Sequence, residues 1–338
     1  MKLLPHSNGV RKVNMKSKKS PKEIIKQVST IFFILILIGF VYQRIANFIS
    51  KETLKERVDY IRVDDKRLDY LLEGDGGKYT IIFDGNIGGN LNQWDLVVED
   101  LTTNYDDIST FVYNRRGYGF SDGGSNRTVK EQAEDLRILL RKSAAPSPYI
   151  LVGEEYGSLV LTEFAKAYPD LVAGIILVNP LVENEINSEE FLKEVRLEKF
   201  RRGIEKLGSN IGLTSLIDKL DIDCKLDEFE NSLEEDDLTE FKSHRTKSNY
   251  TRAVYNELGN IVSGSNSSQE VGVFKEKPYY LIAKENQVEL KSLGDEELTK
   301  VYEISTESNF LSITEKDSVI TGIRQVIKKA NEIERMKK

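Results

Sequence analysis

The segment YILVGEEYGS, residues 149–158, limits the possible folds of this chain more than any other. An apolar strand ends at Gly153, and a helix is expected to begin near Gly157. A side chain at either glycine would clash where the strand and the helix approach each other. The tight turn therefore holds Glu155, its middle residue, in a strained conformation with the carboxylate exposed above a sheet.

Other segments surround this turn in a fixed order. TIIFDGNIGG, residues 80–89, is an apolar strand that leads into a glycine-rich loop, and NRRGYGFS, residues 114–121, follows a second apolar strand. An amphipathic helix is predicted from Thr128 to Lys142, and a buried strand is predicted at residues 174–178. Strands that alternate with helices in this way predict a parallel sheet with right-handed crossovers.

These motifs, in this order, resemble those of the α/β-hydrolase family over roughly residues 57–335. The turn is similar to the nucleophile elbow G-x-S-x-G, with Glu155 where esterases and lipases have serine. The glycine-rich loop is similar to the His-Gly-x-Gly-Gly loop that supplies oxyanion-hole amides, with Asp84 in place of the histidine. The resemblance implies an α/β fold with a mostly parallel sheet flanked by helices, and a helical lid inserted at about residues 183–277.

The resemblance also implies positions for the other two members of a catalytic triad. The acid follows the strand at residues 278–283, where Gln287 stands, or Asn286 if the loop is one residue shorter. Aligning the helix at residues 318–327 with the last helix of the family places Asn309 at the histidine position. An asparagine cannot accept and return a proton at neutral pH, so the expected site lacks its base.

The chain contains only two histidines, His6 in the N-terminal tail and His244 in the lid insertion. The charged neighbours of His244 favour a solvated side chain, although a closed lid would allow it to reach the pocket. We therefore expect a catalytically inactive protein that binds a small-molecule or protein ligand. The pocket and the oxyanion loop are expected to be formed by the following residues: Asp84, Gly85, Asn86 and Tyr156.

A hydrolase of an ester or a related bond, with Glu155 as the nucleophile, is the alternative. The haloalkane dehalogenases and epoxide hydrolases use an aspartate in a similar turn, and a carboxylate attacks carbon without a base. Water must then cleave the resulting ester, and those relatives use their histidine for that step. Glutamate is also one methylene longer than aspartate, which moves the attacking oxygen by over ~1 Å and costs about 100-fold in rate.

Ser158, Ser121 and Cys224 are expected to have structural roles. Ser158 falls in the first helical turn after the elbow, where a small residue packs. Ser121 ends the segment NRRGYGFS, where its hydroxyl is expected to stabilise a turn. Cys224 has no base at a family position and is expected to be an inert thiol.

Three acids, Asp84, Glu154 and Glu155, are expected to lie near the mouth of the pocket. Their mutual repulsion is expected to raise at least one pKa, or to attract a basic group or a metal ion. The N-terminus of the helix after the elbow is expected to bind the Glu155 carboxylate and so close the oxyanion hole. The sequence shows no P-loop or metal-ligand cluster, and no cofactor is expected.

The N-terminal region predicts a membrane anchor at residues 27–49. Residues 27–43 carry no charge and would form a helix about 25 Å long, against a hydrocarbon core of ~30 Å. Residues 1–26 carry eight basic side chains and one acid. The positive-inside rule therefore predicts a single-pass protein of the cell membrane, with a cytoplasmic N-terminus and an extracytoplasmic domain at residues 57–338. A cleaved signal peptide is the alternative, but no small-x-small site follows the apolar stretch.

The charge of the predicted domain differs from that of the tail. The chain has a net charge of −7, and residues 1–26 contribute +7, so the remainder carries −14. Such an acidic domain is expected to avoid nucleic acid, and the basic tail is expected to contact lipid. A single cysteine excludes an internal disulfide.

Overall fold

Eight strands form one sheet in the computed structural model, which describes residues 20–53, 58–74, 77–104, 107–220, 226–264 and 268–337. The strand order is β1-β2-β4-β3-β5-β6-β7-β8. His6 and Cys224 lie outside the described residues. The strands have the following bounds: β1 Asp59–Val63, β2 Lys66–Glu73, β3 Tyr79–Asp84, β4 Ile108–Tyr113, β5 Tyr149–Glu154, β6 Val172–Val178, β7 Tyr279–Ala283 and β8 Thr299–Glu303.

Strands β3 to β8 pair in parallel, whereas β1 and β2 form an antiparallel hairpin at one edge. The turn between β1 and β2 uses positive φ at Asp64 and Asp65, 48° and 61°, which aspartate tolerates better than most residues. The sequence pattern predicts this hairpin from strands at residues 57–63 and 67–72 with a turn at residues 64–66, and both the hairpin and the predicted mostly parallel sheet are confirmed.

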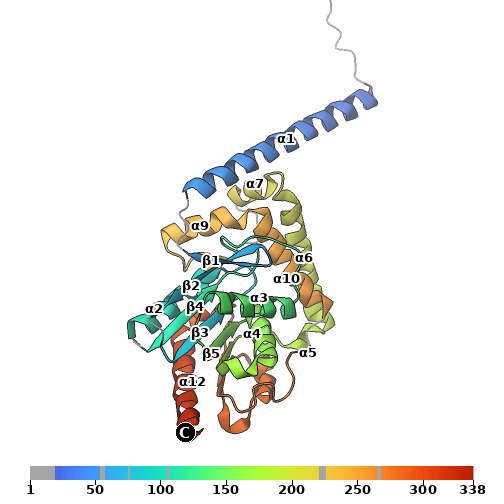
Figure 1. The fold of residues 1–338 in the computed structure, drawn as a ribbon. Helices are drawn as coiled ribbons and strands as arrows, with labels where there is room; N and C mark the ends of the chain where they lie inside the picture. Colours follow the sequence, from blue (N-terminus) through green and yellow to red (C-terminus); the bar gives the residue numbers. More distant parts are fainter. Residues whose placement is uncertain are drawn as a thin grey trace, which may run out of the picture.

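Helices cover both faces of the sheet (Figure 1). α2 (Asp95–Asn104) and α12 (Lys316–Lys337) pack on one face, and α3 (Val129–Lys142) and α4 (Tyr156–Ala167) pack on the other. Side chains alternate along a strand. Ile81 of β3 therefore packs against α2 and α12, and Ile82 packs in the core on the other face, under α3 and α4. Both layers position the carboxyl ends of the parallel strands, where ligands bind in open α/β sheets.

Helix α3 begins where the sequence predicts it. The Thr128 hydroxyl accepts a hydrogen bond from the Glu131 backbone N–H, and the Glu131 carboxylate accepts one from the Thr128 N–H at 2.8 Å. This capping box satisfies two backbone donors that the helix itself leaves unpaired, and such a cap is typically worth about 1 kcal/mol.

The insertion between β6 and β7 is helical, and it packs above the carboxyl ends of the strands. The sequence pattern also predicts helical segments at residues 188–207 and 216–241. The second prediction is wrong as one element, because the structure has separate helices at Asp227–Glu230 and Glu235–Arg245. The acidic residues at 235–237 fall in the first turn of α9, where the helix dipole favours negative charge. The described lid helices are α5 (Glu183–Ile186), α6 (Glu189–Gly208), α7 (Leu213–Lys219), α8 (Asp227–Glu230), α9 (Glu235–Arg245) and α10 (Ser248–Ser263).

Helix α1 (Pro21–Thr53) lies outside the domain and crosses beside α7 (Figure 1). Its window Pro21–Val41 is long and apolar enough to cross a membrane, and none of that window is buried against the rest of the chain. A Cβ atom on Gly39 would collide with the carbonyl oxygen of Ile211. Glycine therefore allows the close approach of α1 to the turn between α6 and α7.

Candidate functional site

The turn between β5 and α4 has the predicted strained geometry. Glu155 has φ 48° and ψ −113°, a conformation that costs a non-glycine residue on the order of 1–3 kcal/mol. A Cβ atom on Gly153 would lie 2.9 Å from the Cα of Ser158, and one on Gly157 would collide with the backbone of Asp84. Both glycines are therefore required by close backbone contacts, as the sequence predicts.

The Glu155 carboxylate turns back onto the backbone amides around it. Its Oε2 accepts hydrogen bonds from the backbone N–H groups of Ile87 and Tyr156, both at 2.8 Å. Tyr156 directly follows the elbow residue, and Ile87 lies in the loop after β3. Backbone N–H groups at these two places form the oxyanion hole of α/β-hydrolases. Burial raises the pKa of Glu155, and the two backbone N–H groups oppose that rise.

Arg115 joins the oxyanion loop to the lid. Its guanidinium pairs with Asp84, and its Nε donates to Glu257 Oε1 of α10 at 2.7 Å. It also donates to the carbonyl oxygens of Gly85 and Asn86, at 2.9 and 3.1 Å. All three charged side chains are buried. Arg115 was not predicted as a site residue, and its only signal in the sequence is that it precedes a second arginine, Arg116, in the segment NRRGYGFS.

Two tyrosines complete this network. The Tyr113 hydroxyl donates to Asp84 at 2.5 Å, and the Tyr118 hydroxyl donates to Glu257 at 2.6 Å. The guanidinium carbon of Arg115 also lies 5.1 Å from the centre of the Tyr156 ring. The buried ion pairs thus have the additional hydrogen bonds without which burial of the charges would be costly.

The prediction that Asp84 and Glu154 lie near the pocket mouth is wrong, because both are buried. Successive side chains of β5 alternate between the faces of the sheet, and Glu154 points toward the C-terminal helices. It accepts hydrogen bonds from the Ser312 N–H at 3.2 Å and from Gln93 Nε2 at 2.8 Å, and it is also bonded to the Leu311 N–H. The predicted rise in pKa is present, but burial causes it: burial raises the pKa of Glu154 to about 7.

Of the two candidates for the acid position, Gln287 faces the interior of the site and Asn286 does not. Gln287 is buried, and its amide donates to Asn179 Oδ1 at 2.8 Å, just after β6. Asn286 instead donates to the carboxylate of Glu185 at the edge of the lid, at 2.9 Å. The inward-facing residue at this position is therefore a neutral amide.

Asn309 contacts the site with its backbone, whereas its side chain is exposed. Its carbonyl oxygen accepts from Asn86 Nδ2 at 2.7 Å, and from Asn179 Nδ2 at 3.5 Å. Its N–H donates to Glu228 of α8 at 3.0 Å. We call residues 304–310 the histidine loop, because the family resemblance places a histidine at position 309. The structure therefore brings together the elbow, the oxyanion loop and the backbone of the histidine loop, but no side chain from position 309.

The prediction that His244 is solvated is wrong. The imidazole is buried edge-on against Phe120, with ring centres 4.6 Å apart, and its Nε2 has no hydrogen-bond partner. Burial, reinforced by the charge of Lys247, lowers the pKa of His244 to about 3. Its one further polar contact is with the backbone of Gly119, so it is not bonded to Glu155.

The two candidate serines have the predicted structural roles. The Ser158 hydroxyl donates to the carbonyl oxygen of Glu155 at 2.5 Å in the first turn of α4. The Ser121 hydroxyl donates to the carbonyl oxygen of Asn114 at 3.0 Å and accepts from the Asp69 N–H at 3.0 Å. Neither is bonded to the imidazole of His244, the one histidine among the described residues.

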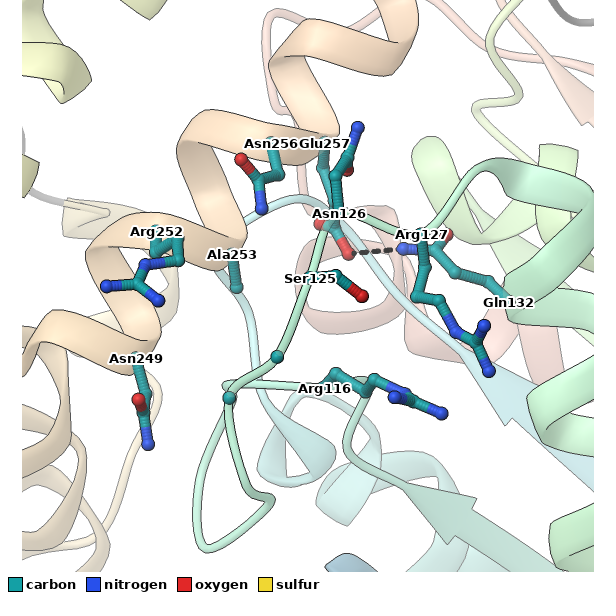
Figure 2. Close-up of a pocket in the computed structure, with 12 residues that line it drawn as sticks. Arg116, Ser125, Asn126, Arg127, Gln132, Asn249, Arg252, Ala253, Asn256 and Glu257 are labelled. Atoms are coloured by element: carbon teal, nitrogen blue, oxygen red, sulfur yellow. Dashed lines mark hydrogen bonds between the residues drawn. The ribbon is translucent and has the colours of Figure 1, made fainter. Parts of the chain in front are cut away.

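The cavities next to this network are small. One, beside Asp84 and Arg115, has a volume of about 10 Å³. Another, of about 20 Å³, lies between α10 and the loop at residues 123–127, where Gln132 donates to Glu257 at 3.2 Å (Figure 2). Each has room for about one water molecule, against roughly 300–1,000 Å³ for a typical ligand pocket. Among the described residues, no group of three or more metal-ligating side chains could hold a metal ion.

Two curated proteins are similar in sequence. The uncharacterized protein YqjL of Bacillus subtilis is 28% identical over 102 residues, 30% of this chain and 39% of that protein. Epoxide hydrolase 1 of Caenorhabditis elegans is 24% identical over 157 residues, 44% of this chain and 38% of that protein. The chain thus spans about two fifths of the length of each of these relatives.

Solved structures share the fold at low sequence identity. The epoxide hydrolase CorEH has a TM-score of 0.59 at 16% identity, over 80% of this chain and 97% of that chain. A putative epoxide hydrolase from Pseudomonas aeruginosa has a TM-score of 0.63 at 14% identity, over 83% and 98%. An esterase from Thermogutta terrifontis has a TM-score of 0.58 at 17% identity, over 81% and 99%.

The family model described as alpha/beta hydrolase fold matches residues 81–257, which include the oxyanion loop, the elbow and most of the lid. That match covers more than half of the sequence, and the strand order and the elbow geometry agree with it. This chain therefore belongs to the alpha/beta hydrolase fold family.

Proposed function

We propose that this protein acts by binding a ligand or a partner at the membrane surface and does not hydrolyse a substrate. The observation that carries the proposal is the position of the Glu155 carboxylate on the N–H groups of Ile87 and Tyr156, 2.8 Å from each. An oxyanion hole accelerates a reaction because its donors are free to bind the charge that develops on a substrate. Here a carboxylate of the chain itself occupies both donors.

The groups around Glu155 support the same proposal. A glutamyl ester formed by Glu155 would need an activated water for its cleavage, and this step requires a base. The acid position is the amide of Gln287, the side chain at Asn309 faces outward, and the Nε2 of His244 has no partner. A base would therefore have to come from a rearranged lid.

The lid supports a role in binding because it is attached to the site by charged side chains. Glu257 of α10 pairs with Arg115, and Glu228 of α8 accepts hydrogen bonds from the backbone of residues 309 and 310. A ligand that competes for either carboxylate would loosen the lid and change its outer surface. We propose that a small-molecule or protein ligand acts in this way.

We further propose that α1 tethers the domain to the membrane. The window Pro21–Val41 has the length and hydropathy of a membrane span, and the basic residues that precede it favour a cytoplasmic N-terminus. Chain that stays in membranes after an alkaline wash and retains its N-terminal residues would support the tether. Mature chain that begins after residue 41 would identify α1 as a cleaved signal sequence and contradict it.

The non-catalytic role is tested by measuring substrate turnover by the full-length chain in detergent. We expect hydrolysis of simple esters, lactones, epoxides and haloalkanes to be the same for the wild type and for Glu155→Gln. The variant is the matched control, because contaminating hydrolases would be present in both preparations. Turnover by the wild type that the variant lacks would overturn the proposal.

An active hydrolase with Glu155 as the nucleophile is the second candidate. It is favoured by the carboxylate at the elbow and by the sequence match to Epoxide hydrolase 1 of Caenorhabditis elegans. In that reaction a Glu155 carboxylate oxygen would attack an epoxide carbon, the C–O bond of the ring would break, and the alkoxide would take a proton. Water would then cleave the ester, so this candidate requires the lid to deliver a base.

A further inference from the structure

Helix α6 exposes large apolar side chains on its outer side and buries two charged side chains near its C-terminal end. The buried side carries Arg202 and Glu205, paired at 3.0 Å. Four large apolar residues recur at helical spacing on the outer side, with exposed fractions from 46% to 74%: Leu197, Phe200, Ile204 and Leu207. A helix that faces water on its outer side has the reverse arrangement, so this surface is suited to an apolar environment.

The apolar surface continues onto α7. Leu213, Leu216 and Leu220 follow the same spacing at the end of the lid, with exposed fractions of 40%, 54% and 59%. We call these seven apolar residues, four on α6, two on α7 and Leu220 directly after α7, the lid corner. Exposed apolar residues thus occur on two consecutive helices, which are joined by the turn at residues 209–212.

The lid corner adjoins α1. Gly39 of α1 and Gly212 of the lid approach so closely that a Cβ atom on either would collide with backbone of the other element. Gly39 lies near the C-terminal end of the membrane-spanning window Pro21–Val41. Figure 1 shows α1 passing beside α7. If α1 spans a bilayer, the contact between Gly39 and Gly212 places the lid corner next to the membrane surface from which α1 emerges.

The charges beside the lid corner complement a lipid surface. Residues 189–220 carry seven basic and six acidic side chains, whereas the chain after residue 26 carries a net −14. Lys199 and Lys206 flank the ring of Tyr255, with ammonium groups 5.1 and 3.9 Å from its centre. Together with Arg196, they line a groove of about 410 Å³ beside Phe200 and Leu207. Basic residues next to an apolar stripe are typical of helices that lie in the lipid interface.

We propose that the lid corner docks on the lipid bilayer, with its apolar residues at the boundary between headgroups and acyl chains and its lysines on anionic headgroups. The proposal rests on the proposed tether, because α1 brings the bilayer to this surface. Docking would link the lid, and through Glu257 and Arg115 the elbow, to the state of the membrane.

The test uses the full-length chain in vesicles of phosphatidylcholine, alone or mixed equally with phosphatidylglycerol. Cys224 is replaced by serine, and a polarity-sensitive fluorophore is attached to Leu207→Cys or, separately, to Leu216→Cys. The matched control is Val271→Cys, which is 84% exposed in the turn before β7, at the opposite end of the sheet. A quencher carried on the lipid acyl chains then reports whether each fluorophore reaches the bilayer.

We expect the fluorophores at 207 and 216 to be quenched at least about twofold more than the one at 271, and more strongly with the anionic lipid. Chain that does not float with the vesicles would contradict both the tether and the docking. Chain that floats, but whose three fluorophores are equally unquenched, would overturn the docking alone. A fluorophore at 207 that is shielded from aqueous iodide but not reached by the lipid quencher would mean that protein covers the lid corner, and would also overturn it.

Discussion

The elbow and the histidine loop lie at the same end of the sheet, but they differ in which of their atoms face the site. At the elbow the backbone is retained: Glu155 has the strained φ, and the N–H groups of Ile87 and Tyr156 still converge on one point. At the histidine loop the backbone points inward, while the side chain of Asn309 points outward. Close packing thus preserves the elbow geometry, whereas the histidine loop is held by hydrogen bonds that any side chain at 309 would permit.

The largest expected effect is on the elbow side, where Arg115→Met would leave Asp84 and Glu257 buried without their cation. Removing one partner of a buried ion pair typically costs about 3–5 kcal/mol of unfolding free energy. Urea denaturation of the full-length chain measures this. Arg324→Met is the control, because it breaks an exposed pair with Asp100 and should cost at most about 1 kcal/mol. Equal losses for the two variants would mean that the buried network does not stabilise the elbow.

Glu154 connects the two regions, and its effect depends on pH. Burial raises its pKa from 4.5 to about 7, so the folded state keeps a proton that the unfolded state loses. The free energy of unfolding contributed by Glu154 therefore falls as the pH rises from 4.5 to 7, by about 3 kcal/mol in total.

The stability contributed by His244 depends on pH in the opposite direction. Burial lowers its pKa to about 3, so its contribution to the free energy of unfolding is lost as the pH falls below 6.5. The measurement is therefore the difference in unfolding free energy between the wild type and Glu154→Gln, in which the effect of His244 cancels. A difference that does not change with pH would show that Glu154 has the same pKa in the folded and unfolded states.

On the histidine loop, Glu228→Gln removes the charge that binds Ser308 and the N–H groups of residues 309 and 310. We expect a loss of about 1 kcal/mol, because these are partly exposed hydrogen bonds to a single carboxylate. Asp227→Asn is the matched control, since it removes a neighbouring charge that makes none of these bonds. Thermal melting of both variants measures the difference, and an unchanged Glu228→Gln would mean that α8 does not hold the loop.

The smallest effect is expected for Asn309→His. Its exposed side chain is expected to change the unfolding free energy by at most about 0.5 kcal/mol, and a histidine there should not restore hydrolysis. Turnover of an ester by Asn309→His combined with Glu155→Ser measures this. A gain of activity that the Glu155→Ser variant lacks would show that the loop still delivers position 309 to the elbow.

The parts of the fold that were predictable are the ones specified by nearby residues. The capping box at Thr128 and the glycines of the elbow each leave a local pattern in the sequence. The alternation along β5 could also have placed Glu154 away from the pocket. The Arg115 network and the burial of His244 depend on contacts across 142 residues and across the lid, for which one sequence gives no local signal.

The site was predictable only by position. The family order of motifs located Glu155, Gln287 and Asn309, but it did not show which way the side chain of Asn309 faces. It also did not predict that Arg115 would supply the positive charge among the acids, because that arginine lies outside the family motif. Side-chain direction in a loop is set by packing partners that lie far away in the sequence.

The most direct test of the role of Glu155 is to incubate the full-length chain with an epoxide in H₂¹⁸O and to measure the ¹⁸O content of the Glu155 carboxylate. Hydrolysis through a glutamyl ester would put ¹⁸O into the Glu155 carboxylate, or leave an adduct there if the ester is not cleaved. We predict that mass analysis of the peptide containing Glu155 finds neither the label nor an adduct, as for Glu155→Gln. Epoxide-dependent ¹⁸O or an adduct at Glu155 would contradict the proposal that its carboxylate only fills the oxyanion hole.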